Sequence, residues 1–262
     1  MGKSLIINTT LQTDAWAALR RLTAARIALG NTGGVIPLKE VLALKMAHAH
    51  ARDAVYASLN EKELLDKLRD FNLPVIAASS QATSREQYLL DPGLGRKLDN
   101  TSLTCVEGSV TPGGIALIIA DGLSATAVNS HAIALLQELI PLVLDTGRKI
   151  NSLFLVREGR VAIGDEIGEW TRAEMTVLLI GERPGLTAAD SLGAYLTFNA
   201  RKGLTDESRN CISNIHGAGL NYSAAAKKIM YLINESFRLG LSGVAVKEQE
   251  NDPSYNLNQE IK

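Results

Sequence analysis

Downstream of residue 113, short apolar runs alternate with longer amphipathic stretches. The first run, GIALIIADG at 114–122, is continuously apolar until it ends in Asp-Gly, which is typical of a strand covered on both faces. Further strands are predicted at 152–164, 175–182 and 191–198, and helices at 125–147, 165–173 and from Ser223 to Gly240. Because strands and helices alternate, the pattern predicts an α/β fold with a mostly parallel sheet flanked by helices.

Upstream, the apolar positions recur with a helical period. Helices are predicted from Thr13 or Asp14 to Gly30, from Pro37 onward, and over 58–72. We therefore predict a helical N-terminal domain at 1–98 and a sheet domain at 99–247. Within the latter, 199–223 reads as a long loop and 242–246 as a small closing strand. The charged, Asn-rich tail at 248–262 is predicted to be disordered.

The strand ends carry the polar residues of interest. In an open α/β sheet, ligands bind beyond the carboxyl ends of the strands. Here these ends carry Asp121-Gly122, the segment 157–161, and Gly181-Glu182-Arg183-Pro184-Gly185. The pattern predicts a functional rim that includes Glu182, although an ion pair between Glu182 and Arg183 with a purely structural role is an equal alternative.

Composition excludes several classes of function. The 262 residues have a formal net charge of -1, so no strong field attracts nucleic acid or anionic lipid. No apolar run approaches the roughly 20 residues of a membrane span, so no membrane partner is expected. The two cysteines, Cys105 and Cys211, do not form a disulfide framework.

The usual catalytic signatures are also missing. The chain has no G-x-G-x-x-G or P-loop, no C-x-x-C or H-E-x-x-H, and no G-x-S-x-G elbow. Cys211 is interpreted as a packing residue or a ligand contact, since a nucleophile would need His216 as its base. The residues alone leave open a partner-dependent enzyme subunit and a binding module, and they disfavour a stand-alone oxidoreductase.

The assembled motifs resemble the small subunit of ethanolamine ammonia-lyase. The resemblance spans about residues 16–246 and rests mainly on GERPGLTAADSLGAY at 181–195 and RNCISNIHGAGLNYSAAA at 209–226. Supporting stretches are ARIALGNTGG at 25–34, HARDAV at 50–55, REQYLLDPGLGRKL at 85–98, IADGLSATAV at 119–128 and GRVAIGDEIGE at 159–169. GERPGL followed by NCISNI is a far more specific signal than a lone glycine pattern.

The resemblance implies a Rossmann-like domain that covers adenosylcobalamin against a TIM-barrel large subunit. That large subunit would hold ethanolamine and the radical that converts it to acetaldehyde and ammonia. By family position, the cofactor contacts in this chain would be Val161, Glu182 and Cys211, with no catalytic residue and no metal ligand. Glu182 would accept hydrogen bonds from amide groups, and Arg183 would balance its charge.

Two further expectations follow from the resemblance. The chain would act in the cytoplasm, or inside a bacterial microcompartment, to which an extended N-terminal segment directs some members of the family. The alternative function is a stand-alone cobalamin-binding module without catalysis. A partner subunit differs from such a module by a large exposed apolar patch.

Overall fold

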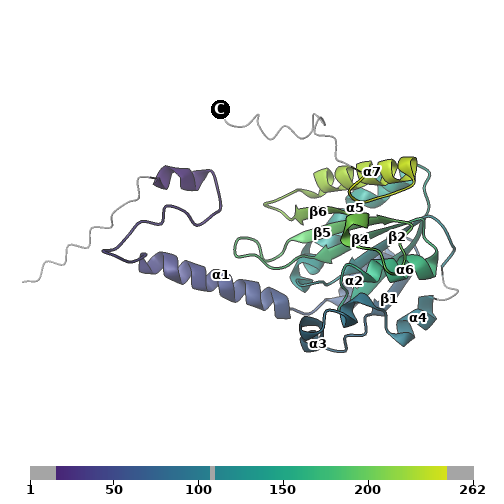
Figure 1. The fold of residues 1–262 in the computed structure, drawn as a ribbon, viewed down its shortest axis with the longest axis horizontal. Helices are drawn as coiled ribbons and strands as arrows, with labels where there is room; N and C mark the ends of the chain where they lie inside the picture. Colours follow the sequence, from purple (N-terminus) through teal and green to yellow (C-terminus); the bar gives the residue numbers. More distant parts are fainter. Residues whose placement is uncertain (1–15, 107–109, 247–262) are drawn as a thin grey trace, which may run out of the picture.

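A mixed six-stranded sheet forms the centre of the computed structural model, which describes residues 16–106 and 110–246 (Figure 1). The strands are β1 (Val75–Ser79), β2 (Ile115–Ala120), β3 (Ile150–Arg157), β4 (Met175–Gly181), β5 (Leu192–Phe198) and β6 (Asn210–Ile215). The helices are η1 (Ala17–Arg21), α1 (Leu38–Tyr56), α2 (Glu61–Arg69), α3 (Arg85–Leu90), η2 (Leu94–Arg96), α4 (Asn100–Val106), α5 (Ala125–Asp145), α6 (Ile163–Thr171), η3 (Asp206–Ser208) and α7 (Tyr222–Leu239).

The central strand β2 is buried on both faces, as its continuous apolar run predicts. Ile115, Leu117 and Ile119 face the core beneath α2, α5 and α7. Ala116 and Ile118 face the opposite core beneath α6. The result is three layers, with helices on both faces of one sheet.

The predicted mostly parallel sheet is wrong, because the sheet is mixed. Its order is β1-β3-β2-β4-β5-β6, and the first four strands are parallel. β5 and β6 are antiparallel to their neighbours. The connection 182–191 contains no helix, and a parallel return would need a crossover of a dozen or more residues. The α/β class is therefore confirmed, whereas the Rossmann-like description is not.

The predicted helical N-terminal domain is likewise not confirmed. β1 lies within residues 1–98 yet pairs with β3 at the edge of the sheet. Leu64 and Leu68 of α2 belong to the main core. The helices predicted from Pro37 onward and over 58–72 are present as α1 and α2. Of the two, α1 projects from the sheet, and of its residues only Ala54 is buried (Figure 1). The division of the chain at 98/99 stays a prediction.

Three smaller expectations also differ from the structure. The predicted loop at 199–223 contains β6, an edge strand whose polar side chains hide it from a hydrophobic pattern. The segment 242–246 forms turns rather than a strand. The predicted first helix is the short η1, while Thr13, Asp14 and the tail at 248–262 lie outside the described residues.

Helix α5 is long and apolar enough to cross a membrane by length and composition. In the structure it is a core helix, with Leu135, Leu136 and Leu139 fully buried against the sheet and α7. Its N-cap is Ser124, whose side chain accepts a hydrogen bond from the backbone N–H of Ala127. This cap directs the chain away from the sheet immediately after β2.

The turn after β2 depends on Gly122, which has a φ of +57°. A Cβ there would lie 2.2 Å from the carbonyl oxygen of Gly181. Gly122→Ala should therefore lower the free energy of unfolding by about 3 kcal/mol, from backbone strain and overpacking together. Chemical denaturation of the purified chain measures this change.

Gly147→Ala is the matched control, because Gly147 also has a positive φ of +76° but no atom within 4 Å of the added Cβ. Gly147→Ala should lower the free energy of unfolding by about 1 kcal/mol, because of backbone strain alone. Equal losses for the two variants would contradict the steric argument.

Candidate functional site

A cavity of about 450 Å³ lies at the carboxyl ends of β2 and β4. Its walls come from both turns after these strands, from the loop after β3, and from β5. The lining residues are Tyr88, Gly122, Leu123, Arg160, Val161, Ile180, Gly181, Glu182, Arg183 and Tyr195. The location agrees with the rim predicted from the strand ends.

Glu182 follows β4 and is held by Ser191, which immediately precedes β5, and by Asn214 of β6. Its N–H donates to the carbonyl of Ser191 at 2.9 Å, and its carboxylate accepts from the Ser191 hydroxyl. The N–H of Asn214 donates to the same carboxylate at 3.2 Å. Within the described part of the chain no ion pair joins Glu182 to Arg183, although both line the cavity. The alternative of a structural ion pair between them is therefore wrong, whereas the expected charge balance by Arg183 stays a prediction.

Val161 and Cys211 reach this region from other elements. Val161 lies between β3 and α6, is partly buried, and lines the same cavity as Glu182. Cys211 on β6 pairs with Tyr195 of β5, which lines the cavity. The structure thus brings Val161 and Glu182 into one cavity and places Cys211 beside it.

The Cys211 thiol has no features of an activated nucleophile. Loss of hydration raises its pKa, and the charge of Glu182 raises it further, against a hydrogen bond with Tyr195 that lowers it. The ring of His216 contacts Asn214 at 2.9 Å and the N–H of Ala218 at 3.3 Å, rather than Cys211. The pair has no nucleophile–base geometry.

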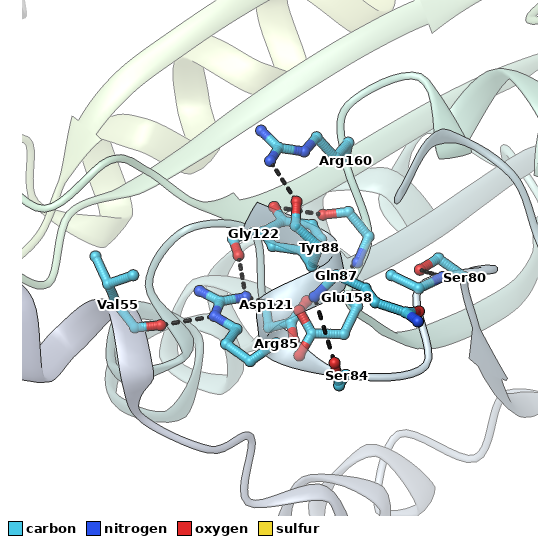
Figure 2. A network of polar contacts seen from close by, with 12 residues as sticks. Val55, Ser80, Ser84, Arg85, Gln87, Tyr88, Asp121, Gly122, Glu158 and Arg160 are labelled. Carbon is cyan, nitrogen blue, oxygen red and sulfur yellow. Dashed lines mark hydrogen bonds and ion pairs between the residues drawn. The ribbon is translucent and has the colours of Figure 1, made fainter. Parts of the chain in front are cut away.

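Tyr88 of the cavity wall was not predicted from the sequence, and Arg160 lies in the predicted rim segment 157–161 but was not singled out as a contact. Tyr88 is fully buried, and its hydroxyl donates to the carbonyl of Gly159 at 3.2 Å. The Arg160 guanidinium lies 4.3 Å from the Tyr88 ring centroid and donates from Nη2 to the Tyr88 carbonyl at 2.8 Å (Figure 2). This contact joins segments far apart in the chain, so the sequence does not predict it. The glycines of DPGLGR are the one available signal, since they allow a close backbone approach.

A polar network adjoins the cavity at Gly122 (Figure 2). Arg85 Nη1 donates to Glu158 and to the carbonyl of Gly122, both at 2.8 Å, and Arg85 Nε donates to the carbonyl of Val55 at 2.6 Å. It therefore ties the end of α1 to the turns after β2 and β3. A second cavity, of about 500 Å³, is lined by Arg85, Asp121 and Glu158 among others.

Asp121 is buried within this network. The N–H of Gly159 donates to its carboxylate at 3.1 Å. Burial, with a smaller contribution from the charge of Glu158, raises its pKa to about 7. Among residues 16–106 and 110–246, no three His, Cys, Asp or Glu side chains gather as metal ligands. The network therefore positions the turns around the cavity.

The connection 182–191 is anchored to α5 and its N-cap, and through α5 to α7. His131 contacts the Tyr222 hydroxyl through Nδ1 at 2.8 Å and the Asp190 carboxylate through Nε2 at 3.1 Å. The Ser124 hydroxyl donates to the carbonyl of Ala189 at 2.9 Å. Because Ser191 contacts Glu182, these anchors also fix the position of the Glu182 carboxylate.

Comparison with known proteins bears directly on this arrangement. A family model described as Ethanolamine ammonia-lyase light chain matches residues 13–247. The chain belongs to the ethanolamine ammonia-lyase small-subunit family. The ethanolamine ammonia-lyase small subunit of Azotobacter vinelandii is 48% identical over 240 residues, which cover 90% of this chain and 89% of the relative.

Two other ethanolamine ammonia-lyase small subunits are similarly close. The protein of Ralstonia nicotianae is 46% identical over 248 residues, 93% of this chain and 92% of the relative. That of Xanthomonas campestris pv. campestris (strain B100) is 45% identical over 249 residues, 94% and 92% of the two chains. The predicted membership in the ethanolamine ammonia-lyase small-subunit family is confirmed.

In this ethanolamine ammonia-lyase family member, Asp121 should make stability depend on pH. Its folded-state pKa of about 7 lies above the ordinary value near 4, so the folded chain holds a proton that the unfolded chain releases. The stabilisation that comes from protonated Asp121 is present at low pH, and the free energy of unfolding falls as the pH rises towards 7. Asp121→Asn should therefore gain about 3 kcal/mol relative to the wild type between pH 5 and pH 8.

Urea unfolding at these two pH values measures the difference. The Asn side chain can still accept from Gly159, so the variant tests the charge rather than the hydrogen bond. An unchanged difference between the two chains at both pH values would exclude titration of Asp121.

His131→Phe should loosen the connection 182–191. It removes the hydrogen bonds to Tyr222 and Asp190, so local opening should become roughly tenfold more frequent. Amide hydrogen exchange across residues 183–190 measures this change. Tyr222→Phe is the control, because it removes only one bond and leaves His131 on Asp190. Similar exchange in the wild type and His131→Phe would show that the anchor is dispensable.

Proposed function

We propose that this chain is the adenosylcobalamin-contacting small subunit of ethanolamine ammonia-lyase. It acts with a large subunit that holds the substrate. The proposal is carried by one observation: Val161 and Glu182 share a cavity at the strand ends, with Cys211 beside it. Within the described residues, this cavity has no metal cluster and no nucleophile–base pair that would support catalysis by this chain alone.

The residues of the cavity fit the edge of a corrin ring. Leu123, Val161 and Ile180 present apolar surface, Glu182 offers an acceptor, and Arg160 offers donors. A volume of about 450 Å³ suits a drug-sized group, and a cobalamin is larger than that. The rest of the ligand therefore needs a second surface, which the large subunit supplies in this proposal.

Each residue has a defined task in this arrangement. The radical chemistry that converts ethanolamine to acetaldehyde and ammonia comes from the bound cofactor. Glu182 accepts from a ligand N–H, Val161 packs against the ring, and Cys211 excludes water at the margin. The sequence has no D-x-H-x-x-G motif, since the third residue of DGLSAT is Leu123 rather than His, so this chain would supply no cobalt ligand from that turn.

A stand-alone cobalamin module is the alternative, and the surface of α1 argues against it. Leu38, Leu42 and Met46 are spaced by four residues and are 70%, 54% and 60% exposed. They form an apolar stripe on a helix that projects from the sheet, as is typical of a chain with a partner. The oxidoreductase alternative finds no support, since no glycine fingerprint follows β2.

Glu182→Gln should weaken cobalamin binding about tenfold in the mixture of this chain and the large subunit. Loss of the charge turns a charge-assisted hydrogen bond into a neutral one. Titration of cobalamin followed by visible absorption measures the dissociation constant. Glu138→Gln is the control, because Glu138 is exposed on α5 and outside the cavity lining.

The same titration without the large subunit separates the two proposals. Tight binding to this chain alone, with no gain on mixing, would favour the stand-alone module. Ammonia release from ethanolamine only in the mixture would support the partner-dependent subunit.

A further inference from the structure

We propose that Arg160 and Glu182 together recognise one primary carboxamide on the edge of the ligand. Arg160 donates to its carbonyl oxygen, and Glu182 accepts from its NH₂ group. The inference rests on the proposed cobalamin site, because primary carboxamides surround the corrin ring. It adds Arg160 as a specificity-determining residue and gives Glu182 a defined partner group.

Arg160 is held in place by contacts that leave most of its donors unused. Its backbone N–H donates to the carbonyl of Gly95 at 2.7 Å, and Nη2 donates to the Tyr88 carbonyl at 2.8 Å. Its Cγ would lie 2.7 Å from a Cβ at residue 95, so only glycine permits this approach. The side chain is therefore oriented before any ligand arrives.

Arg160 lines the cavity, and part of its guanidinium has no hydrogen-bond partner among residues 16–106 and 110–246. Within the described residues, Arg160 Nη1 has no hydrogen-bond partner, and Nε is buried without one. Figure 2 shows the far end of the guanidinium pointing away from Tyr88 and the other labelled residues. A guanidinium has five N–H donors in a planar fork, so one or two of them remain for a ligand acceptor.

Glu182 also lines the cavity and can supply the acceptor, and two hydrogen bonds hold its carboxylate in place. Ser191 and Asn214 donate to its carboxylate. No ion pair joins Glu182 to Arg160 in the part of the chain that the structure describes, although both line one cavity. The cavity therefore keeps the Arg160 donor and the Glu182 acceptor unpaired with each other, with Arg183 and the apolar Leu123 and Ile180 in the same lining.

This pair of charges selects the chemistry of its ligand group. An anionic carboxylate or phosphate on this group would be repelled by Glu182, and a cation would be repelled by Arg160 and by Arg183, which lines the same cavity. A neutral group with one acceptor and one donor satisfies both residues without a net charge. The primary carboxamide is the group on the ligand's edge that has this pattern.

The protein-side test is a cobalamin titration into the mixture with the large subunit. Arg160→Met should raise the dissociation constant tenfold to about a hundredfold, as expected for loss of a charged hydrogen bond. Arg160→Lys should recover part of the loss. Arg157→Met is the matched control, because Arg157 ends β3 just before Arg160, contacts Ser79 and lies outside this cavity. Equal affinities for Arg160→Met and the wild type would overturn the inference.

The ligand-side test replaces one peripheral carboxamide at a time by a carboxylic acid. At one ring position the acid should bind the wild type at least tenfold more weakly than cobalamin. Glu182→Gln should remove most of that deficit, because it removes the repulsion. This test remains available if Arg160→Met disturbs folding, which thermal unfolding would detect. Equal deficits with and without Glu182→Gln at every position would overturn the inference.

Cobinamide, which lacks the nucleotide phosphate, distinguishes the two acceptors that Arg160 could meet. A loss of the same size with cobinamide supports the carboxamide. Disappearance of the loss would assign Arg160 to the phosphate and overturn the inference. The proposed function fails separately, if the wild-type mixture binds no cobalamin at all.

Discussion

The close approach of the turns after β2 and β4 underlies the whole site. A Cβ at Gly122 would lie 2.2 Å from the Gly181 carbonyl oxygen, and a Cβ at Gly181 would lie 2.1 Å from the Ser124 carbonyl oxygen. The backbones can therefore meet, and the N–H of Leu123 donates to Gly181 at 3.0 Å. This contact sets where α5 begins and where Glu182 leaves the sheet.

Around this contact, the charged side chains are held in two different ways. Tyr88 holds Arg160 and Ser191 holds Glu182, so these two charges of the cavity wall have neutral partners. Arg85 and Glu158 instead form an ion pair at 2.8 Å beside the cavity. Within the described part of the chain, Arg160 Nε is buried without a hydrogen-bond partner, which has a cost in stability.

The sequence predicts those elements whose pattern is local, and it misses those that depend on residues far away in the chain. The continuous apolar run at β2 and the strand at β4 are local signals, and both predictions are confirmed. β1 is short and rich in alanine, and β6 is a polar edge strand. Both are stabilised by neighbours far away in the chain, so a local pattern does not reveal them. The same holds for the antiparallel direction of β5.

The sequence by itself determined the α/β class, the central buried strand, the rim at the strand ends and the family. These properties reside in periodicity and in contiguous motifs such as GERPGL. Only the tertiary structure decided that Arg183 does not pair with Glu182, and that Tyr88 and Arg160 complete the cavity wall. Such contacts join residues 72 positions apart. They depend on strand order and on missing Cβ atoms, which no local pattern encodes.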